Sequence, residues 1–342
     1  MSIEQVTIKD IARKLNIAPS TVSRALKDHP DISDATKKAV MEVAKEMDYQ
    51  PNTVALSLRK SKTFTLGVIV PEIVHFFFSS IISGIEDVAY AEGYHVMICQ
   101  SNEDFDREVS STNALLMSRV DGMLISMSKH TEDYDHFRTI QKRGIPIVFF
   151  DRVCKELDTS TVVAEDHHGA YEATEHLIKA GCRKIMHLEG PTGLLISKNR
   201  KQGFLDAMKD YDLSVKDEWI SKADNFEEGY KTLKEVLIKG DKPDAVFTIN
   251  DKTALGAMKA IKEHGLRIPT EIAIVGFSDD PNINVLIDPP LTSVAQPGYD
   301  MGTTAARLFF DHLSNKESLE ITHEVLKTQL VIRESSLFGK EL

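Results

Sequence analysis

Residues 19–24 carry side chains that suit contacts with nucleic acid. In "PSTVSRAL" a proline takes the first position of a predicted short helix, whose outer face presents Pro19, Ser20, Thr21, Ser23 and Arg24. Small hydroxyl groups near a helix start suit contacts with phosphate, and an arginine suits the edge of a guanine base. The alternative is a small helical bundle without a partner, in which this polar face is simply solvated.

Three predicted helices within residues 1–50 would position that face. In "TIKDIARKL" the apolar residues recur at the spacing of one helix face, and Thr7 is placed to cap its start. Asn16 lies at the following turn, where a left-handed backbone is needed and asparagine tolerates it. A third helix follows Ser33. We therefore expect a small all-α helix-turn-helix domain over residues 1–50.

Charge is distributed unevenly along the chain. Residues 1–62 carry a formal charge of +3, whereas residues 63–342 carry −14. A basic head on an acidic body keeps affinity for nucleic acid local to the head. The asymmetry alone is a weak signal, because most charged residues simply form solvated surface.

Several classes of function are excluded by what the sequence does not contain. It has no G-x-S-x-G, G-x-x-x-x-G-K-[ST] or post-strand G-x-G-x-x-G motif, so we do not expect an enzyme. The cysteines Cys99, Cys154 and Cys182 have no metal-ligand spacing. His167 and His168 are neighbours that cannot share a helix face, so neither a metal site nor a cofactor is expected. The chain starts without a charged-then-apolar leader, which predicts a cytoplasmic protein.

Residues 63–342 alternate strand-like and helix-like runs. Strand-like runs such as "TLGVIVP", "IPIVFFD" and "IAIVGFSD" are separated by amphipathic runs of about 12–16 residues. This pattern is typical of parallel sheets with helices on both faces. About ten strands are too many for one comfortable sheet, so two lobes are expected.

The stretch "TVALSLRKSK", residues 53–62, does not read as an ordinary linker. It predicts a helix of about two turns, capped by Asn52, with apolar residues at positions 54, 55, 56 and 58 followed by basic ones. A helix this short is not stable alone in water. Its apolar side chains therefore need a partner that the rest of the chain does not obviously provide.

An ordered set of motifs resembles the LacI/GalR family of transcription regulators. It runs from "VTIKDIARKLNIAPSTVSRAL" and "YQPNTVALSLRKSKT" through "SGIEDVAYAEGY", "TINDKTALGAMKAI" and "PPLTSVAQPGYDMG", and covers nearly the whole chain. The resemblance implies a sequence-specific regulator, with repression the expected outcome, that binds a near-palindromic operator as a homodimer. It implies DNA contacts by Thr7 and base reading by the positions that match Pro19, Ser20 and Arg24.

The resemblance also implies the domain organisation. Residues 51–62 would be a hinge helix that enters the minor groove, where Leu58 pries open a base step, Val54 and Ala55 face the partner helix, and Asn52 and Arg59 lie at the DNA. Residues 63–342 would form a core like a periplasmic sugar-binding protein. Its first lobe is expected at about 63–161 and 293–321, and its second at about 162–292 and 322–338.

The implied effector site lies in the cleft between these lobes, off the carboxyl ends of the strands. The matching residues are His75, Phe76, Phe77, Asp151, Arg200, Phe226, Asn250, Ser278, Asp279 and Gln296. Carboxylates, amides and an aromatic plate suit a sugar or sugar derivative. Ser278 stands where aspartate is commoner, so a sugar phosphate or acidic ligand stays open. His75 could equally be a turn residue, and Asp251 is expected only to cap a helix.

Three questions stay open at this stage. The sequence does not tell whether the ligand loosens or tightens DNA binding, nor whether target genes are repressed or activated. A protein corepressor is conceivable, because the surface of "YDMGTTAARL" loosely resembles that of relatives that bind one. No membrane association is expected, and nucleoid association is expected when the protein is bound to DNA.

Overall fold

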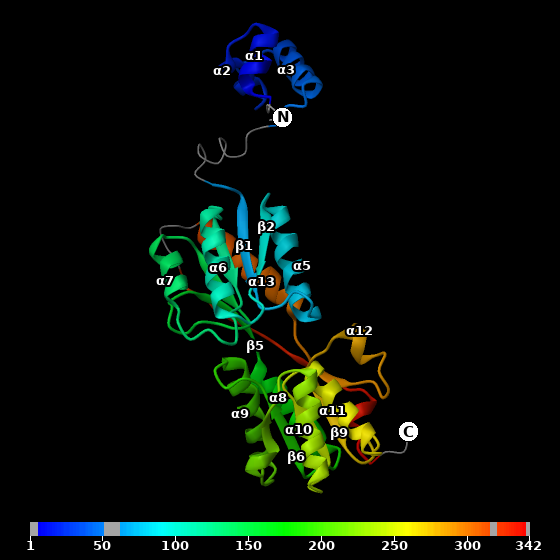
Figure 1. The fold of residues 1–342 in the computed structure, drawn as a ribbon. Helices are drawn as coiled ribbons and strands as arrows, with labels where there is room; N and C mark the ends of the chain where they lie inside the picture. The colour runs from blue at the N-terminus through cyan, green and yellow to red at the C-terminus, as the bar shows by residue number, and fades with distance from the viewer. Residues whose placement is uncertain (1–5, 51–61, 315–319, 340–342) are drawn as a thin grey trace. The chain divides into compact units, whose positions relative to one another are not determined.

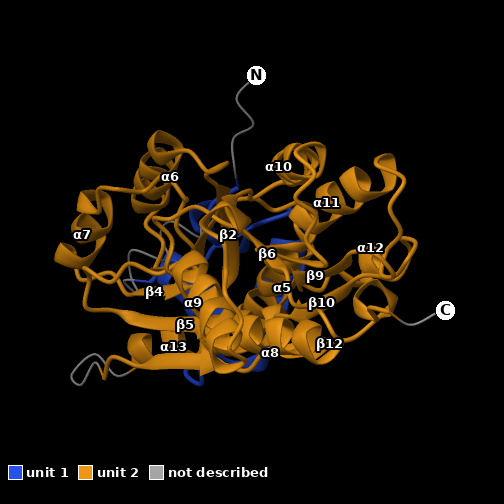
Figure 2. Ribbon diagram, turned by 90° about the horizontal axis from the view of Figure 1, so that it is seen from below, with its two compact units in different colours: residues 1–63 blue, residues 64–342 orange. Residues whose placement is uncertain are grey.

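The computed structural model describes residues 6–50, 62–314 and 320–339. The chain forms two compact units, Met1–Thr63 and Phe64–Leu342, drawn in blue and orange in Figure 2. No helix in the described ranges is long and apolar enough to cross a membrane. The predicted hinge positions Asn52, Val54, Ala55, Leu58 and Arg59 lie outside the described residues.

The first unit is a three-helix head, as predicted. Its helices are α1 (Ile8–Leu15), α2 (Pro19–Ala25) and α3 (Asp34–Glu46). They close around Ile11, Val22 and Val40, which are fully buried. At the end of α1, Asn16 has a φ of 52°, the left-handed conformation that the turn requires. The two α-helices of the motif are therefore fixed against each other by a small core and a tight turn.

The second unit contains two six-stranded sheets with helices on both faces (Figure 1). The first has the order β11-β5-β4-β3-β1-β2 and all its strands are parallel. Its strands are β1 (Thr65–Val70), β2 (His95–Gln100), β3 (Gly122–Ile125), β4 (Ile147–Phe150), β5 (Ser160–Ala164) and β11 (His323–Leu326). Its helices are α5 (Phe76–Ala91), α6 (Phe105–Met117), α7 (Asp135–Lys142) and α13 (Gly298–Ser314). We call this sheet and its helices the first lobe.

The second sheet has the order β12-β10-β9-β8-β6-β7, with β12 antiparallel to β10. Its strands are β6 (Ile185–Glu189), β7 (Ile220–Lys222), β8 (Ala245–Thr248), β9 (Ala273–Ser278), β10 (Thr292–Ala295) and β12 (Gln329–Val331). Its helices are α8 (Asp166–Lys179), α9 (Leu195–Asp210), α10 (Phe226–Ile238), α11 (Asp251–Glu263) and α12 (Pro281–Asn284), with short 3₁₀ turns at Asp217–Trp219 and Glu334–Ser336. We call this the second lobe.

The chain passes between the lobes at slightly different places than expected. The first lobe was expected to end at about residue 161, but strand β5 of the first sheet continues to residue 164. Residues from 293 on were expected in the first lobe, but β10 (292–295) belongs to the second sheet. The strand-like run "EVLKTQLVIRES" near the C-terminus is divided between β11 of the first sheet and β12 of the second. Apolar patterning marks each strand, but it does not tell which sheet a strand joins.

Candidate functional site

A cavity of about 610 Å³ lies in the second unit and is lined by residues of both lobes. Nine of the ten residues expected to bind an effector line it: His75, Phe76, Phe77, Asp151, Arg200, Phe226, Asn250, Ser278 and Gln296. They come from the carboxyl ends of four strands, from the starts of α5 and α10 and from the second turn of α9. Parallel sheets bring the carboxyl ends of their strands to one edge, which explains why residues so distant in sequence meet here.

The tenth residue, Asp279, does not line the cavity. Its carboxylate accepts hydrogen bonds from Nη1 and Nη2 of Arg333 at 2.6 and 3.2 Å, and Oδ1 also accepts one from Asn284 at 3.2 Å. The next residue, Asp280, lines the cavity in its place. Arg333 lies 54 positions further along the chain, so no local pattern reveals this ion pair.

Arg200 is buried, with only 4% of its surface exposed. Its Nε and Nη2 both lie 2.7 Å from Oδ1 of Asp166, and Nη1 donates to the carbonyl of Ile249 at 2.6 Å. The guanidinium also stacks 3.6 Å from the centre of the Phe277 ring. Burial raises the pKa of the Asp166 carboxyl, and the nearby Arg200 charge opposes that rise. Most of the donors of Arg200 are therefore engaged within the protein.

Asn250 is the N-cap of α11. Its side-chain oxygen accepts a hydrogen bond from the Thr253 N–H at 2.9 Å, and its amide donates to the carbonyl of Asp224 at 2.8 Å. Asp251, expected to cap this helix, instead supports the loop after β9 by accepting from Ser293 at 2.6 Å and Asn284 at 2.9 Å. Capping and loop support thus account for the polar groups of both residues.

Asp151 is the buried carboxylate least engaged by the protein. It directly follows β4, with 5% of its surface exposed, in a left-handed conformation with a φ of 57°. The distances to its Oδ2 are long, 3.5 Å from the Ser126 hydroxyl and 3.9 Å from Nε of Arg152. Burial raises its pKa to about 6, although the charge of Arg152 opposes the shift. It is an acceptor available to a ligand.

The cavity also contains charged residues that the sequence did not point to. His75 contacts Glu72 within its own loop and lies 3.3 Å from Nζ of Lys252 in the second lobe. Burial lowers the pKa of His75, assisted by the charge of Lys252. Arg152 donates to Glu103 at 2.7 Å. Among Glu72, Glu103, Arg152 and Lys252, only Arg152 had a signal in the sequence, because it directly follows the predicted site residue Asp151.

Ser278 adopts a φ of 127°, which side chains with a Cβ rarely tolerate. It ends β9 and lines the cavity. We expect Ser278→Gly to raise the free energy of unfolding by about 1 kcal/mol, because removing Cβ relieves more strain than the glycine loses in chain entropy. Urea unfolding measures the change, with Ser221→Gly in β7 as the control that should be destabilised. A loss of stability in Ser278→Gly would show that the backbone is not strained.

The head presents the predicted nucleic-acid face on α2. Pro19, Ser20 and Arg24 are exposed, while Thr21 and Ser23 are partly buried. The Arg24 side chain is 59% exposed, and its one ion pair in the described head is a 4.0 Å approach to Asp31. Thr7 caps α1, and both its N–H and its hydroxyl donate to Asp10, at 3.0 and 2.7 Å.

Metal binding has little support in the described ranges. No group of three or more His, Cys, Asp or Glu side chains there could hold a metal ion. His167 lies 2.8 Å from Asp206, and His168 lies 3.3 Å from Glu172, so the two imidazoles pair with different carboxylates.

Comparison with known proteins agrees with the fold. Residues 7–52 match the family described as bacterial regulatory proteins, lacI family, and residues 63–329 match the periplasmic binding proteins and sugar binding domain of the LacI family. Catabolite control protein A of Priestia megaterium is 31% identical, and the match covers 97% of this chain and 99% of that protein. The ribose operon repressor of Halalkalibacterium halodurans is 33% identical, with 98% of each chain covered.

A solved structure of the lac repressor dimer, bound to its operator and the anti-inducer ONPF, superposes with a TM-score of 0.85 at 25% identity. That likeness covers 98% of this chain and 100% of the repressor chain. A complex of the transcriptional regulator CelR with cellobiose gives a TM-score of 0.74 at 27% identity, covering 97% and 100% of the two chains. The chain therefore belongs to the LacI family of bacterial regulatory proteins and is a DNA-binding transcriptional regulator rather than an enzyme.

Proposed function

We propose that this protein represses transcription by binding a near-palindromic operator as a homodimer, and that a neutral sugar or polyol in the 610 Å³ cavity controls its operator affinity. The observation that carries the proposal is the meeting of both lobes around one available carboxylate, Asp151. The relatives named as ribose operon repressor and as a CelR–cellobiose complex support a carbohydrate ligand. The exposed polar face of α2 and the match of residues 7–52 to the lacI family support operator binding.

The charges around the cavity favour a neutral ligand. Three of its cations already face carboxylates: Lys129 lies 2.9 Å from Asp224, Arg152 2.7 Å from Glu103 and Arg200 2.7 Å from Asp166. Among the described residues, Lys252 has a polar contact with His75 alone. Asp151, Glu227 and Asp280 also line the cavity and have no cation within 3.5 Å among the described residues. Hydroxyl groups can donate to such carboxylates, whereas a phosphate would be repelled.

Ligand binding can regulate DNA binding only if the ligand distinguishes two arrangements of the lobes. A ligand that contacts both lobes has different contacts when the lobes move apart. In a dimer such movement changes the spacing of the two heads, which must match the spacing of the operator half-sites. We further propose that the protein acts in the cytoplasm on nucleoid DNA, which imaging of a fluorescent fusion would test.

Operator selection with the purified full chain tests the proposed function. We expect a near-palindromic site to be enriched from a random library, with an affinity that falls as salt rises. A panel of neutral sugars and their phosphates then identifies the ligand by its effect on operator affinity. Failure to enrich any palindromic site would refute the proposal.

The ligand should bind more weakly at low pH. An ionised Asp151 accepts hydrogen bonds from ligand hydroxyls, and the buried carboxyl has a pKa of about 6. Affinity is therefore fully present above pH 7 and is lost as the carboxyl is protonated below pH 6, by about tenfold between pH 7 and 5. Calorimetric titration of the selected ligand measures this. Asp151→Asn should bind weakly at every pH; an unchanged pH profile in that variant would assign the titration to another group.

A further inference from the structure

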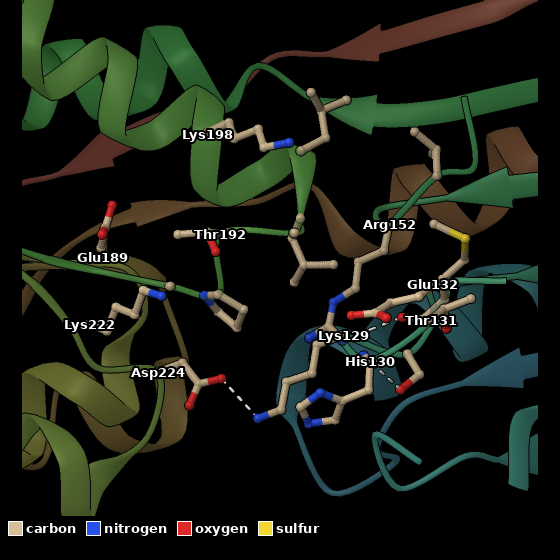
Figure 3. A pocket seen from close by; sticks show the side chains of 18 of the residues that line it. Lys129, His130, Thr131, Glu132, Arg152, Glu189, Thr192, Lys198, Lys222 and Asp224 are labelled. Atoms are coloured by element: carbon tan, nitrogen blue, oxygen red, sulfur yellow. Dashed lines mark hydrogen bonds and ion pairs between the residues drawn. The ribbon is translucent and has the colours of Figure 1, made fainter. Parts of the chain in front are cut away.

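A second cavity, of about 710 Å³, adjoins the first (Figure 3). The residues that line both are Lys129, Arg152, Pro191, Leu194 and Asp224. Among these, Nζ of Lys129 in the first lobe lies 2.9 Å from Oδ2 of Asp224 in the second. This ion pair stands where the two cavities meet. We call the second cavity the outer cavity.

The carboxylates of the outer cavity are mostly neutralised by the protein. Glu156 pairs with Arg138 at 2.7 Å, and Glu189 pairs with Lys201 at 3.0 Å. Asp224 is held by Lys129. Of the lining acids, Glu132 and Glu228 have no cation among the described residues. Most of the negative charge of this cavity is therefore compensated locally.

Three lysines of the outer cavity have no such partner. Lys155 follows β4 in the first lobe, Lys198 lies on α9 and Lys222 ends β7 in the second. All three residues are exposed, and their ammonium groups form no hydrogen bond or ion pair with the described residues. Figure 3 shows Lys198 and Lys222 on one side of the cavity with Thr192 between them, and Arg152 on the other. The free side chains are mainly hydrogen-bond donors.

The start of α9 adds donors to the same space. The helix is 16 residues long, and its N-cap, Leu194, has no side chain able to accept from the first-turn amides. Leu194, Leu195 and Lys198 all line the outer cavity. A Cβ added at Gly193 would meet nothing within 4 Å, so a ligand can approach this backbone closely. A helix N-terminus next to free lysines favours an anion.

We propose that the outer cavity is a second ligand site, which binds a small organic phosphate monoester through Lys155, Lys198 and Lys222. The phosphate oxygens only accept hydrogen bonds, which suits a cavity whose free groups mainly donate. Because these lysines come from both lobes, a bound phosphate ties the lobes together. It also competes with Asp224 for Lys129, which links the outer cavity to the inner one. The proposal does not depend on the identity of the ligand in the inner cavity.

Calorimetric titration of the full chain, without DNA and at constant ionic strength, tests this site. The probes are glycerol 3-phosphate, glycerol and inorganic phosphate. We expect saturable binding of glycerol 3-phosphate, weaker binding of inorganic phosphate and none of glycerol. The double variant K198M/K222M should bind glycerol 3-phosphate about tenfold more weakly. The matched control is K231M/K239M, which removes two exposed lysines of the same lobe, one on α10 and one directly after it, that line neither cavity.

A second variant, Asp224→Asn, separates this site from a general attraction of anions. It frees Lys129 and should tighten the binding of glycerol 3-phosphate several-fold. The control K231M/K239M should bind glycerol 3-phosphate with the wild-type affinity. The proposal is overturned if no phosphate binds saturably, if the control loses as much affinity as K198M/K222M, or if inorganic phosphate binds as tightly as the ester. These titrations contain no operator DNA, so their outcome does not depend on whether operator selection succeeds.

Discussion

Replacing Arg200 by methionine is expected to lower the free energy of unfolding of the second lobe by about 3–5 kcal/mol. The guanidinium is buried and holds Asp166 at 2.7 Å. Methionine keeps much of the volume, but it leaves the Asp166 carboxylate buried without its counterion. Urea unfolding, followed by the fluorescence of the buried Trp219 in the second lobe, measures the change.

Two further variants isolate the charge. Lys209→Met, in the last turn of the same helix, removes an exposed lysine that forms no ion pair with the described residues and should cost less than about 1 kcal/mol. Adding Asp166→Asn to Arg200→Met should recover part of the lost stability, since no uncompensated charge then remains. A loss below about 1 kcal/mol in Arg200→Met, or no recovery in the double variant, would contradict a stabilising ion pair.

This prediction changes how Arg200 is to be tested as a ligand contact. The resemblance to relatives assigns it to the ligand, whereas its hydrogen bonds to Asp166 and Ile249 assign it a structural role as well. A variant that loses ligand binding because its second lobe is destabilised would mimic loss of a contact. Asp151, which has few partners in the protein, is the better residue for separating the two effects.

Replacing Arg24 by alanine is expected to weaken binding to the selected operator by about 10- to 100-fold, with a smaller effect on random DNA. Arg24 lies in the last turn of α2, and its side chain is mostly free of other contacts. A guanidinium that donates two hydrogen bonds to a guanine contributes to discrimination between bases, whereas a contact with phosphate contributes to affinity alone. Fluorescence anisotropy with both DNAs at one salt concentration measures the two effects.

Arg13→Ala provides the matched control. Arg13 is on α1, with 81% of its side chain exposed and Asp10 at 3.3 Å. Its loss should change binding to both DNAs by a similar, small factor, and it should alter the salt dependence at most slightly. If Arg24→Ala lowers operator and random-DNA affinity equally, the residue contacts the backbone and does not read bases.

Local sequence patterns were sufficient for the architecture. The head follows from helix-spaced apolar residues, an asparagine at the turn and a proline at the start of α2, all of which act over a few residues. The alternation of apolar strands with amphipathic helices predicted two mainly parallel sheets, and the structure contains two such sheets, with β12 antiparallel to β10 in the second. These features depend on periodicity and capping, so they can be recognised without knowledge of distant contacts.

Sheet membership could not be recognised in the same way. The residues of β10 and β11 have strand-like patterns, yet each joins the sheet opposite to the one expected. A strand has the same pattern in either sheet, because both present a buried apolar face. The choice depends on which edge the chain reaches after the preceding helix, and this is a property of the whole lobe.

The head, the two-lobed α/β core and the group of strand ends around the cavity could all be predicted from the sequence alone. Only the tertiary structure decided which of those polar residues are available. Asp279 is held by Arg333, Asn250 caps α11 and Arg200 faces Asp166, while Asp151 has few partners. Pairing depends on side chains that are 34 and 54 positions apart for Arg200 and Asp279. Such pairs form only when folding brings strand ends together, and so no local pattern contains them.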